Sequence, residues 1–148
     1  MPLTWTLDAF SELAIARWYA ISQARTAVFI VEQNCPYQDL DGKDAKCLHL
    51  AGWDGAALAA YLRIVPPGVS YAEASLGRVL TSAAYRRGGF GRQLLTEGIA
   101  RCSDIHGGPI RIGAQRYLER FYGELGFVTA SPEYDEDGIP HVEMIRPG

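Results

Sequence analysis

Residues 76–102 constrain the fold of this 148-residue chain more than any other segment. A β-like run at 76–81 leads through the glycine-rich turn 86–91 (RRGGFG) into an amphipathic helical pattern. A glycine-rich turn between a strand and a helix start gathers unpaired backbone N–H groups at the positive end of the helix dipole. The segment therefore predicts an anion site, most commonly for phosphate, with Arg87 and Arg92 adding positive charge.

Two common nucleotide-binding motifs do not fit this turn. A dinucleotide fingerprint needs a third glycine, and Leu94 occupies that position. A P-loop needs a Gly-Lys-Ser/Thr sequence, which the chain lacks. The turn alone leaves two interpretations open: a phosphate cradle of another kind, or a tight connection between strand and helix without a ligand.

The charge of the chain favours a small anionic ligand over a polymer. The net charge is -3, and no long basic patch is available to neutralise nucleic-acid phosphates, so nucleic-acid binding is not expected. The basic residues gather instead around the glycine turn. They are Arg78, Arg86, Arg87 and Arg92.

Length and composition predict a single domain, residues 1–148, with an ordinary 48% of hydrophobic and 21% of charged residues. Cys35, Cys47 and Cys102 show no paired spacing, and we find neither a secretory leader nor a long apolar run. We therefore expect a cytoplasmic protein without a membrane segment. No metal site is expected, because Cys47-x-His49 is not a usual pair of zinc ligands.

Hydrophobic periodicity predicts a mixed α/β domain with the order β-α-β-β-β-α-β-α-β-β. Strands are expected at residues 4–8, 47–53, 57–65, 76–81, 110–112, 127–130 and 139–145, and helices at about 13–32, 90–105 and 116–125. Asp54-Gly55 predicts a hairpin between the second and third strands. The polar loop at 33–42 is long for a plain connection, which favours a binding role.

A second motif lies where a predicted helix ends at Gly126 and leads into a strand at Phe127. Glycine capping and core packing explain these two residues, but they do not require a tyrosine at position 122. Together, and in this order, the two motifs resemble the GNAT superfamily of acetyl-CoA-dependent N-acetyltransferases. Residues 86–91 match the family's pyrophosphate-binding signature, and Tyr122-x-x-x-Gly126-Phe127 matches its second signature.

The similarity extends to the ElaA-like subfamily and covers nearly the whole chain. The segments that carry it are 29–39 (FIVEQNCPYQD), 77–79 (GRV), 113–115 (GAQ) and 136–141 (EDGIPH). The resemblance implies a twisted mixed sheet flanked by helices, with a V-shaped split between two central strands. It also implies that acetyl-CoA lies in that split as the cosubstrate.

Family positions imply a role for each matching residue. The strand residues 79–81 would pair with the pantetheine arm, and the glycine turn would wrap the pyrophosphate, where a β-carbon would hold the phosphate away from the backbone. Tyr122 would be the general acid near the CoA sulfur, because a phenol with a pKa near ~10 can protonate a departing thiolate. The implied cofactor-binding residues are Val79, Leu80, Thr81, Arg86, Arg87, Gly88, Gly89, Phe90, Gly91, Arg92, Gln115 and Tyr122.

Two positions depart from the family pattern. Gln115 stands where many members have an asparagine, and Ile110 stands where some members have a glutamate base. A base is still needed, because an amine with a pKa of about 10.4 is mostly protonated at neutral pH. The catalytic candidates are Glu32 and His141; His49 and Glu133 are weaker ones, as a core histidine and a solvated loop charge.

By this resemblance the chain would transfer an acetyl group to a primary amine of a small molecule or a peptide by direct attack. Acidic side chains in two loops would suit a cationic amine, although they could equally be solvated turn residues: Asp39, Asp41, Asp135, Glu136 and Asp137. The alternative is a CoA-binding regulatory or catalytically weak module. Homodimers are common in the superfamily, so a dimer is as open as a monomer.

Overall fold

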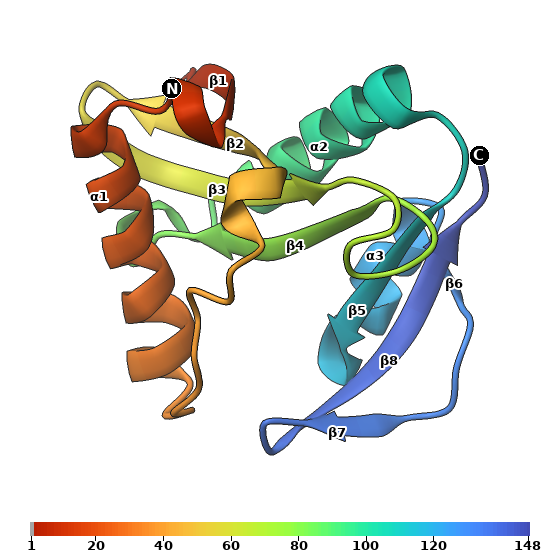
Figure 1. Cartoon of the computed structure of the whole chain (residues 1–148). Coiled ribbons are helices and arrows are strands. Elements are labelled where there is room, and N and C mark those ends of the chain that lie inside the picture. Colours follow the sequence, from red (N-terminus) through yellow and green to blue (C-terminus); the bar gives the residue numbers. More distant parts are fainter. Residues whose placement is uncertain (1) are drawn as a thin grey trace.

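The computed structural model describes residues 2–148, which form two antiparallel sheets with helices packed against them (Figure 1). The strands are β1 (Thr4–Ala9), β2 (Leu48–Asp54), β3 (Ala57–Val65), β4 (Ser75–Thr81), β5 (Ile110–Gln115), β6 (Val128–Thr129), β7 (Tyr134–Glu136) and β8 (Ile139–Arg146). The helices are α1 (Ile15–Arg25), α2 (Phe90–His106) and α3 (Glu119–Glu124). Short 3-10 turns occur at Phe10–Glu12, Asp44–Lys46, Ala83–Tyr85 and Arg116–Leu118.

The two sheets meet at one point and then diverge. The first has the order β1-β2-β3-β4, and the second has the order β5-β8-β6 with β7 on the outer part of β8. Only a parallel bridge between Ala74 and Ile110 joins β4 to β5 in the described chain. Beyond that bridge β4 and β5 separate (Figure 1), which confirms the predicted V-shaped split.

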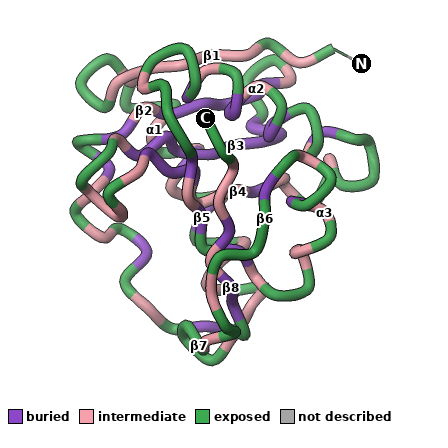
Figure 2. The backbone as a smooth tube through the Cα atoms, turned by 90° about the vertical axis from the view of Figure 1, so that its right-hand side faces the viewer, coloured by how far each residue is buried: buried purple, intermediate pink, exposed green. Residues whose placement is uncertain are grey.

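Strand β3 lies in the centre of the first sheet and is buried on both faces (Figure 2). Its side chains alternate between two clusters, because successive residues of a strand point to opposite faces. Tyr61 packs toward Ile21 of α1, whereas Leu62 packs toward Leu94 of α2. Gly98 allows the close approach of α2, since a Cβ there would stand 2.7 Å from the Leu62 side chain.

The first helix changes character before it ends. It begins at Ile15 and continues past Arg25 as a π-helical segment, Thr26–Glu32. Branched side chains such as those of Val28 and Ile30 lower helix propensity here, and π-helical turns are often found at functional sites. The predicted helix up to about residue 32 is therefore correct in extent but not in type for its last two turns.

Strand β7 was not expected, because its charged residues Asp135 and Glu136 favour a turn. The turn lies one step later, at Asp137 and Gly138, whose φ angles are 53° and 81°. Two positive φ values in a two-residue loop are the geometry that joins antiparallel strands. The turn brings Glu136 opposite Ile139, so residues 134–136 pair with β8 as a short strand.

Candidate active site

The strand β4 is interrupted in its middle, next to the split. Its pairing with β3 passes from Leu80 opposite Tyr61 to Gly77 opposite Arg63, so Arg78 and Val79 lie together opposite one residue. Arg78 has a φ of 51°, outside the range of ordinary strands. A bulge of this kind leaves one residue out of the ladder, so backbone polar groups here are available to a ligand in the split.

Helix α2 begins beside the same strand with its first turn uncapped by any side chain. Gly89 precedes the helix with a φ of 78°, and a Cβ built on it would meet nothing within 4 Å. The first N–H groups of a helix have no partner inside the helix and carry its positive dipole. The residues present therefore fit a pyrophosphate, since the first amides of α2 have no partner inside the helix and Gly89 carries no side chain beside them.

One cavity of about 1090 Å³ connects this helix start with the opposite end of the split. The cofactor-binding candidates that line it are Val79, Leu80, Thr81, Arg86, Gly91, Gln115 and Tyr122. The others, Arg87, Gly88, Gly89, Phe90 and Arg92, form the turn and helix start around it, where Phe90 is buried against Tyr85. Arg92 pairs on the surface with Glu124 at 2.7 Å.

Tyr122 lies where the aromatic core meets the cavity. Its ring packs edge-to-face against Phe121 and Phe127, and the residue is 6% exposed. Burial raises the pKa of Tyr122 to about 12, because the phenolate would lose its hydration. The hydroxyl is therefore fully protonated at neutral pH and can act as a proton donor toward the cavity.

His141, on β8, also lines the cavity. It stands opposite Gln115 in the pairing of β8 with β5 and is 7% exposed. Its Nδ1 is 2.7 Å from the carbonyl oxygen of Ile139, which only an Nδ1–H can satisfy. The remaining nitrogen, Nε2, lies 3.3 Å from the carboxylate of Glu136. Both ring nitrogens of His141 thus face oxygen atoms that accept hydrogen bonds.

The other candidate bases lie in less suitable places. Glu32 lines the cavity but is held by Arg86 at 2.7 Å, near the cofactor end. His49 is fully buried: its Nε2 donates to the Asp44 carbonyl at 2.9 Å and its Nδ1 accepts from Tyr61 at 2.7 Å. Burial lowers the pKa of His49, so this histidine is neutral and structural.

Neither Glu133 nor Ile110 lines the cavity. The carboxylate of Glu133 is exposed and lies 3.5 Å from Arg116. Ile110 is buried at the bridge where the two sheets meet, away from the open part of the split. A base at that position would have no access to the described cavity.

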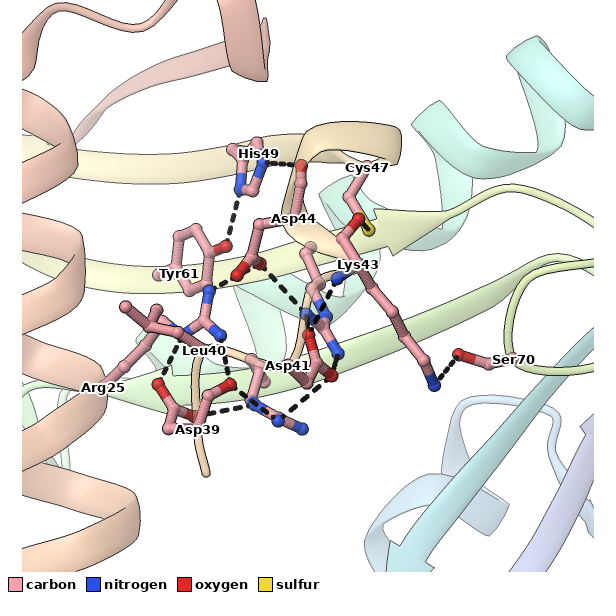
Figure 3. A network of polar contacts seen from close by, with 12 residues as sticks. Arg25, Asp39, Leu40, Asp41, Lys43, Asp44, Cys47, His49, Tyr61 and Ser70 are labelled. Atoms are coloured by element: carbon pink, nitrogen blue, oxygen red, sulfur yellow. Dashed lines mark hydrogen bonds and ion pairs between the residues drawn. The ribbon is translucent and has the colours of Figure 1, made fainter. Parts of the chain in front are cut away.

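The loop at 33–43 is held by a closed ring of ion pairs that sequence analysis missed (Figure 3). Each carboxylate of the ring contacts two guanidinium groups, and each guanidinium contacts two carboxylates, at 2.6–3.3 Å. We call this set the ion ring. Its members, in order around the ring, are Arg25, Asp39, Arg78, Asp41, Arg63 and Asp44.

Asp39 and Asp41 were expected to attract a cationic amine, but both carboxylates are already paired with guanidinium groups of the ion ring. Burial by itself would raise the pKa of Asp41, but the hydrogen bonds and charge of Arg63 outweigh it and lower that pKa. Three positive and three negative charges cancel within the ring. Of the five acids expected to attract a cationic amine, Glu136 and Asp137 are those that line the cavity without belonging to the ring.

A signal for the ring was present in the sequence. Arg63 falls inside the apolar strand Ala57–Val65, and a buried guanidinium must find carboxylates. The partners could not be chosen from the sequence, because they lie 19 and 22 residues away in a loop without regular structure.

Cys35 connects the same loop with the β7–β8 turn. Its thiol donates a hydrogen bond to the carbonyl oxygen of Asp137, at 3.2 Å, and both residues line the cavity. All three cysteines are buried and unpaired. Among residues 2–148, no helix is both long and apolar enough to cross a membrane.

A split sheet, a glycine turn at a helix start and a buried tyrosine on the following helix together define the GNAT class of acyltransferases. Residues 8–146 match the family model described as an acetyltransferase (GNAT) domain, so the chain belongs to this family and is an N-acetyltransferase. Protein ElaA of Escherichia coli K12 is 42% identical over 97% of this chain and 96% of its own length.

Solved structures agree with this assignment. An acyl-CoA N-acyltransferase from Pseudomonas aeruginosa superposes with a TM-score of 0.93 at 39% identity, covering 97% of this chain and 99% of the other. The crystal structure of Escherichia coli ElaA gives a TM-score of 0.91 at 39% identity, with the same coverage. The expected ElaA-like subfamily is thereby confirmed.

Proposed function

We propose that this enzyme transfers the acetyl group of acetyl-CoA to the primary amine of a small molecule by direct attack. The observation that carries the proposal is one continuous cavity, which joins the open start of α2 and Tyr122 at one end to His141 and Glu136 at the other. Donor and acceptor can therefore meet in the same space.

On the donor side, the first turn of α2 would bind the pyrophosphate, and the bulged part of β4 would pair with the pantetheine arm. Backbone donors at Arg78 and Val79 would orient the acetyl carbonyl. Acetyl-CoA supplies an activated thioester, and the protein supplies position and protons.

On the acceptor side, His141 would take a proton from the ammonium group through Nε2, with Nδ1–H fixed on the Ile139 carbonyl. Glu136 would stabilise the resulting imidazolium. As the bond between nitrogen and acetyl carbon forms and the carbon–sulfur bond breaks, Tyr122 would protonate the departing sulfur. The second proton that the nitrogen loses would return to the Tyr122 phenolate, so one proton remains on His141 and is released to solvent.

The contact of Cys35 with Asp137 supports a small acceptor over a folded protein. It joins the 33–43 loop to the β7–β8 turn, and both segments border the acceptor end of the cavity. A large acceptor would have to separate them.

The test is the release of free CoA thiol from acetyl-CoA across a panel of primary amines, with acetyl-CoA binding measured in parallel by calorimetry. Turnover with at least one amine supports the proposal. Binding of acetyl-CoA without turnover on any amine would instead identify a CoA-binding module that has lost transfer.

A further inference from the structure

Some charged side chains line the cavity without belonging to the ion ring, and they indicate which charges the acceptor carries. Arg63 and Arg78 line the cavity, but their charges are compensated by the carboxylates of the ring. Lys43 also lines the cavity and lies outside the ring. It is therefore a separate positive charge at the acceptor end.

Lys43 is held in place but not neutralised. Its ammonium donates to the hydroxyl of Ser70 at 3.1 Å, and within residues 2–148 no carboxylate forms an ion pair with it (Figure 3). Its backbone is fixed as well, because its N–H donates to Asp41. A half-buried ammonium beside a hydroxyl, in a cavity, is a site that an anion would complete.

The opposite wall of the cavity carries negative charge. Glu136 faces His141, and Asp137 follows it in the turn. Tyr71, which follows Ser70 in the chain, reaches from one wall to the other. Its hydroxyl lies so close to Gly113 on β5 that a Cβ built on this glycine would be 3.1 Å away. The acceptor end is thus dipolar, with a cation on one wall and acids on the other.

We propose that the acceptor carries a carboxylate as well as its amine, and that Lys43 with Ser70 binds this carboxylate while His141 and Glu136 receive the amine. The substrate class is free amino acids and other small amino-carboxylic acids. One lysine with one hydroxyl suits a singly charged carboxylate better than a phosphate. The assignment rests on the proposed function, since it uses the same cavity.

The experiment compares acceptors in pairs that differ only by the carboxylate: glycine with methylamine, β-alanine with ethylamine, 4-aminobutyrate with propylamine, and phenylalanine with phenethylamine. We expect kcat/KM to be about 10- to 100-fold higher for the carboxylated member of at least one pair. Lys43→Gln should reduce this ratio of kcat/KM values, carboxylated over plain amine, by a similar factor, mainly by raising the KM for the carboxylated acceptor. Lys43→Arg should retain part of the ratio.

Lys46→Gln is the matched control, because Lys46 is an exposed lysine that does not line the cavity. It should leave the ratio as in the wild type. The assignment would be overturned if plain amines and their carboxylated partners had equal kcat/KM values. It would also be overturned if Lys43→Gln left the ratio of those values unchanged.

A binding measurement separates this assignment from the proposed function. With CoA bound, N-acetylglycine and N-acetyl-β-alanine should raise the melting temperature of the wild type more than N-methylacetamide and N-ethylacetamide do, and Lys43→Gln should abolish the difference. No difference in the wild type contradicts the carboxylate site. Turnover of none of the amines contradicts the transferase proposal and leaves this binding result to decide the carboxylate site alone.

Discussion

Tyr122 combines an apolar setting with access to the cavity. Two aromatic neighbours pack against its ring, and burial raises its pKa to about 12. A primary amine loses its proton near a pKa of about 10.4, so the tyrosine still carries its proton where the amine is already free. The same residue can therefore serve as the acid over the whole range in which the acceptor is reactive.

Replacing Tyr122 by Phe should lower kcat by about 10²- to 10⁴-fold, with little change in the KM for acetyl-CoA. The wild type should show no loss of kcat through ionisation of Tyr122 below about pH 11, because its raised pKa keeps it protonated. Steady-state kinetics between about pH 6 and pH 11 would measure both effects. Tyr19→Phe, at an exposed position on α1, is the control and should behave as the wild type. Unchanged kcat in Tyr122→Phe would exclude the acid role.

Replacing His141 by Asn should also lower kcat by about 10²- to 10⁴-fold at pH 7, because nothing then accepts the proton of the ammonium group. Raising the pH toward that of amine ionisation should recover much of the loss, since the acceptor then arrives as the free base. Glu32→Gln should leave kcat within a few-fold. If Glu32→Gln lost kcat and His141→Asn did not, the base would instead be Glu32, at the cofactor end of the cavity.

Family motifs in the sequence named residues that the structure brings to one cavity. Tyr122, Gln115 and His141 all line the cavity, as the motifs indicated. The motifs could not locate Lys43 or the role of Arg63, because both depend on which loop folds over which strand. Such partners are set by tertiary structure, not by local spacing.

The start of α2 depends on a backbone conformation that only glycine adopts without strain. Gly89 has a φ of 78° immediately before the first helical residue. A longer side chain in this left-handed region costs roughly 1–2 kcal/mol. The open amides of the helix start are therefore linked to one glycine.

Replacing Gly89 by Ala should lower the free energy of unfolding by roughly 1–2 kcal/mol and raise the Kd for acetyl-CoA, because the turn must shift to relieve the strain. Urea unfolding and calorimetry would measure the two effects. Gly123→Ala is the matched control: Gly123 lies in α3 with no positive φ and nothing within 4 Å of a Cβ. That change should leave stability equal or raise it by up to about 1 kcal/mol. Equal cofactor binding in both variants would contradict the role of the helix start.

Periodicity located most elements of the fold but not the short ones. The central strand β3 has the predicted bounds of 57–65, since a buried apolar run has few alternatives. Strand β7 was missed because three polar residues become a strand only when the adjacent turn presents them to β8. β5 also extends three residues further than predicted, to Gln115, through its pairing with β8.

The ion ring links α1, the 33–43 loop, β3 and β4, and it makes the whole molecule sensitive to acid. Burial opposes the ionisation of Asp44, but the hydrogen bonds and charges of Arg25 and Arg63 outweigh it and lower its pKa. A carboxylate with a lowered folded pKa stabilises the protein above its ordinary pKa of about 3.8–3.9. That stabilisation disappears as the pH falls through the folded pKa.

Replacing Asp44 by Asn should therefore cost about 3–5 kcal/mol of stability at pH 7, because two buried guanidinium groups lose a shared partner. The gap between variant and wild type should begin to narrow below about pH 4, where the carboxylate of the unfolded wild type takes up a proton, and it should close as the pH falls through the lowered folded pKa. Urea unfolding at pH 7, 5 and 3 would follow the gap. Glu97→Gln, on an exposed pair with Arg101, is the control and should stay within about 0.5 kcal/mol at every pH. A gap that does not depend on pH would show that Asp44 contributes by packing alone.

The single backbone bridge between Ala74 and Ile110 has a consequence for the abundance of the enzyme in a cell. If the pantetheine arm occupies the place of a strand between β4 and β5, a diffusing metabolite completes the fold. At a concentration 100 times its Kd, such a metabolite adds about 2.7 kcal/mol to stability. Depletion of CoA and its thioesters would then expose the chain to proteolysis, so its turnover would follow the level of the CoA pool without a dedicated regulator.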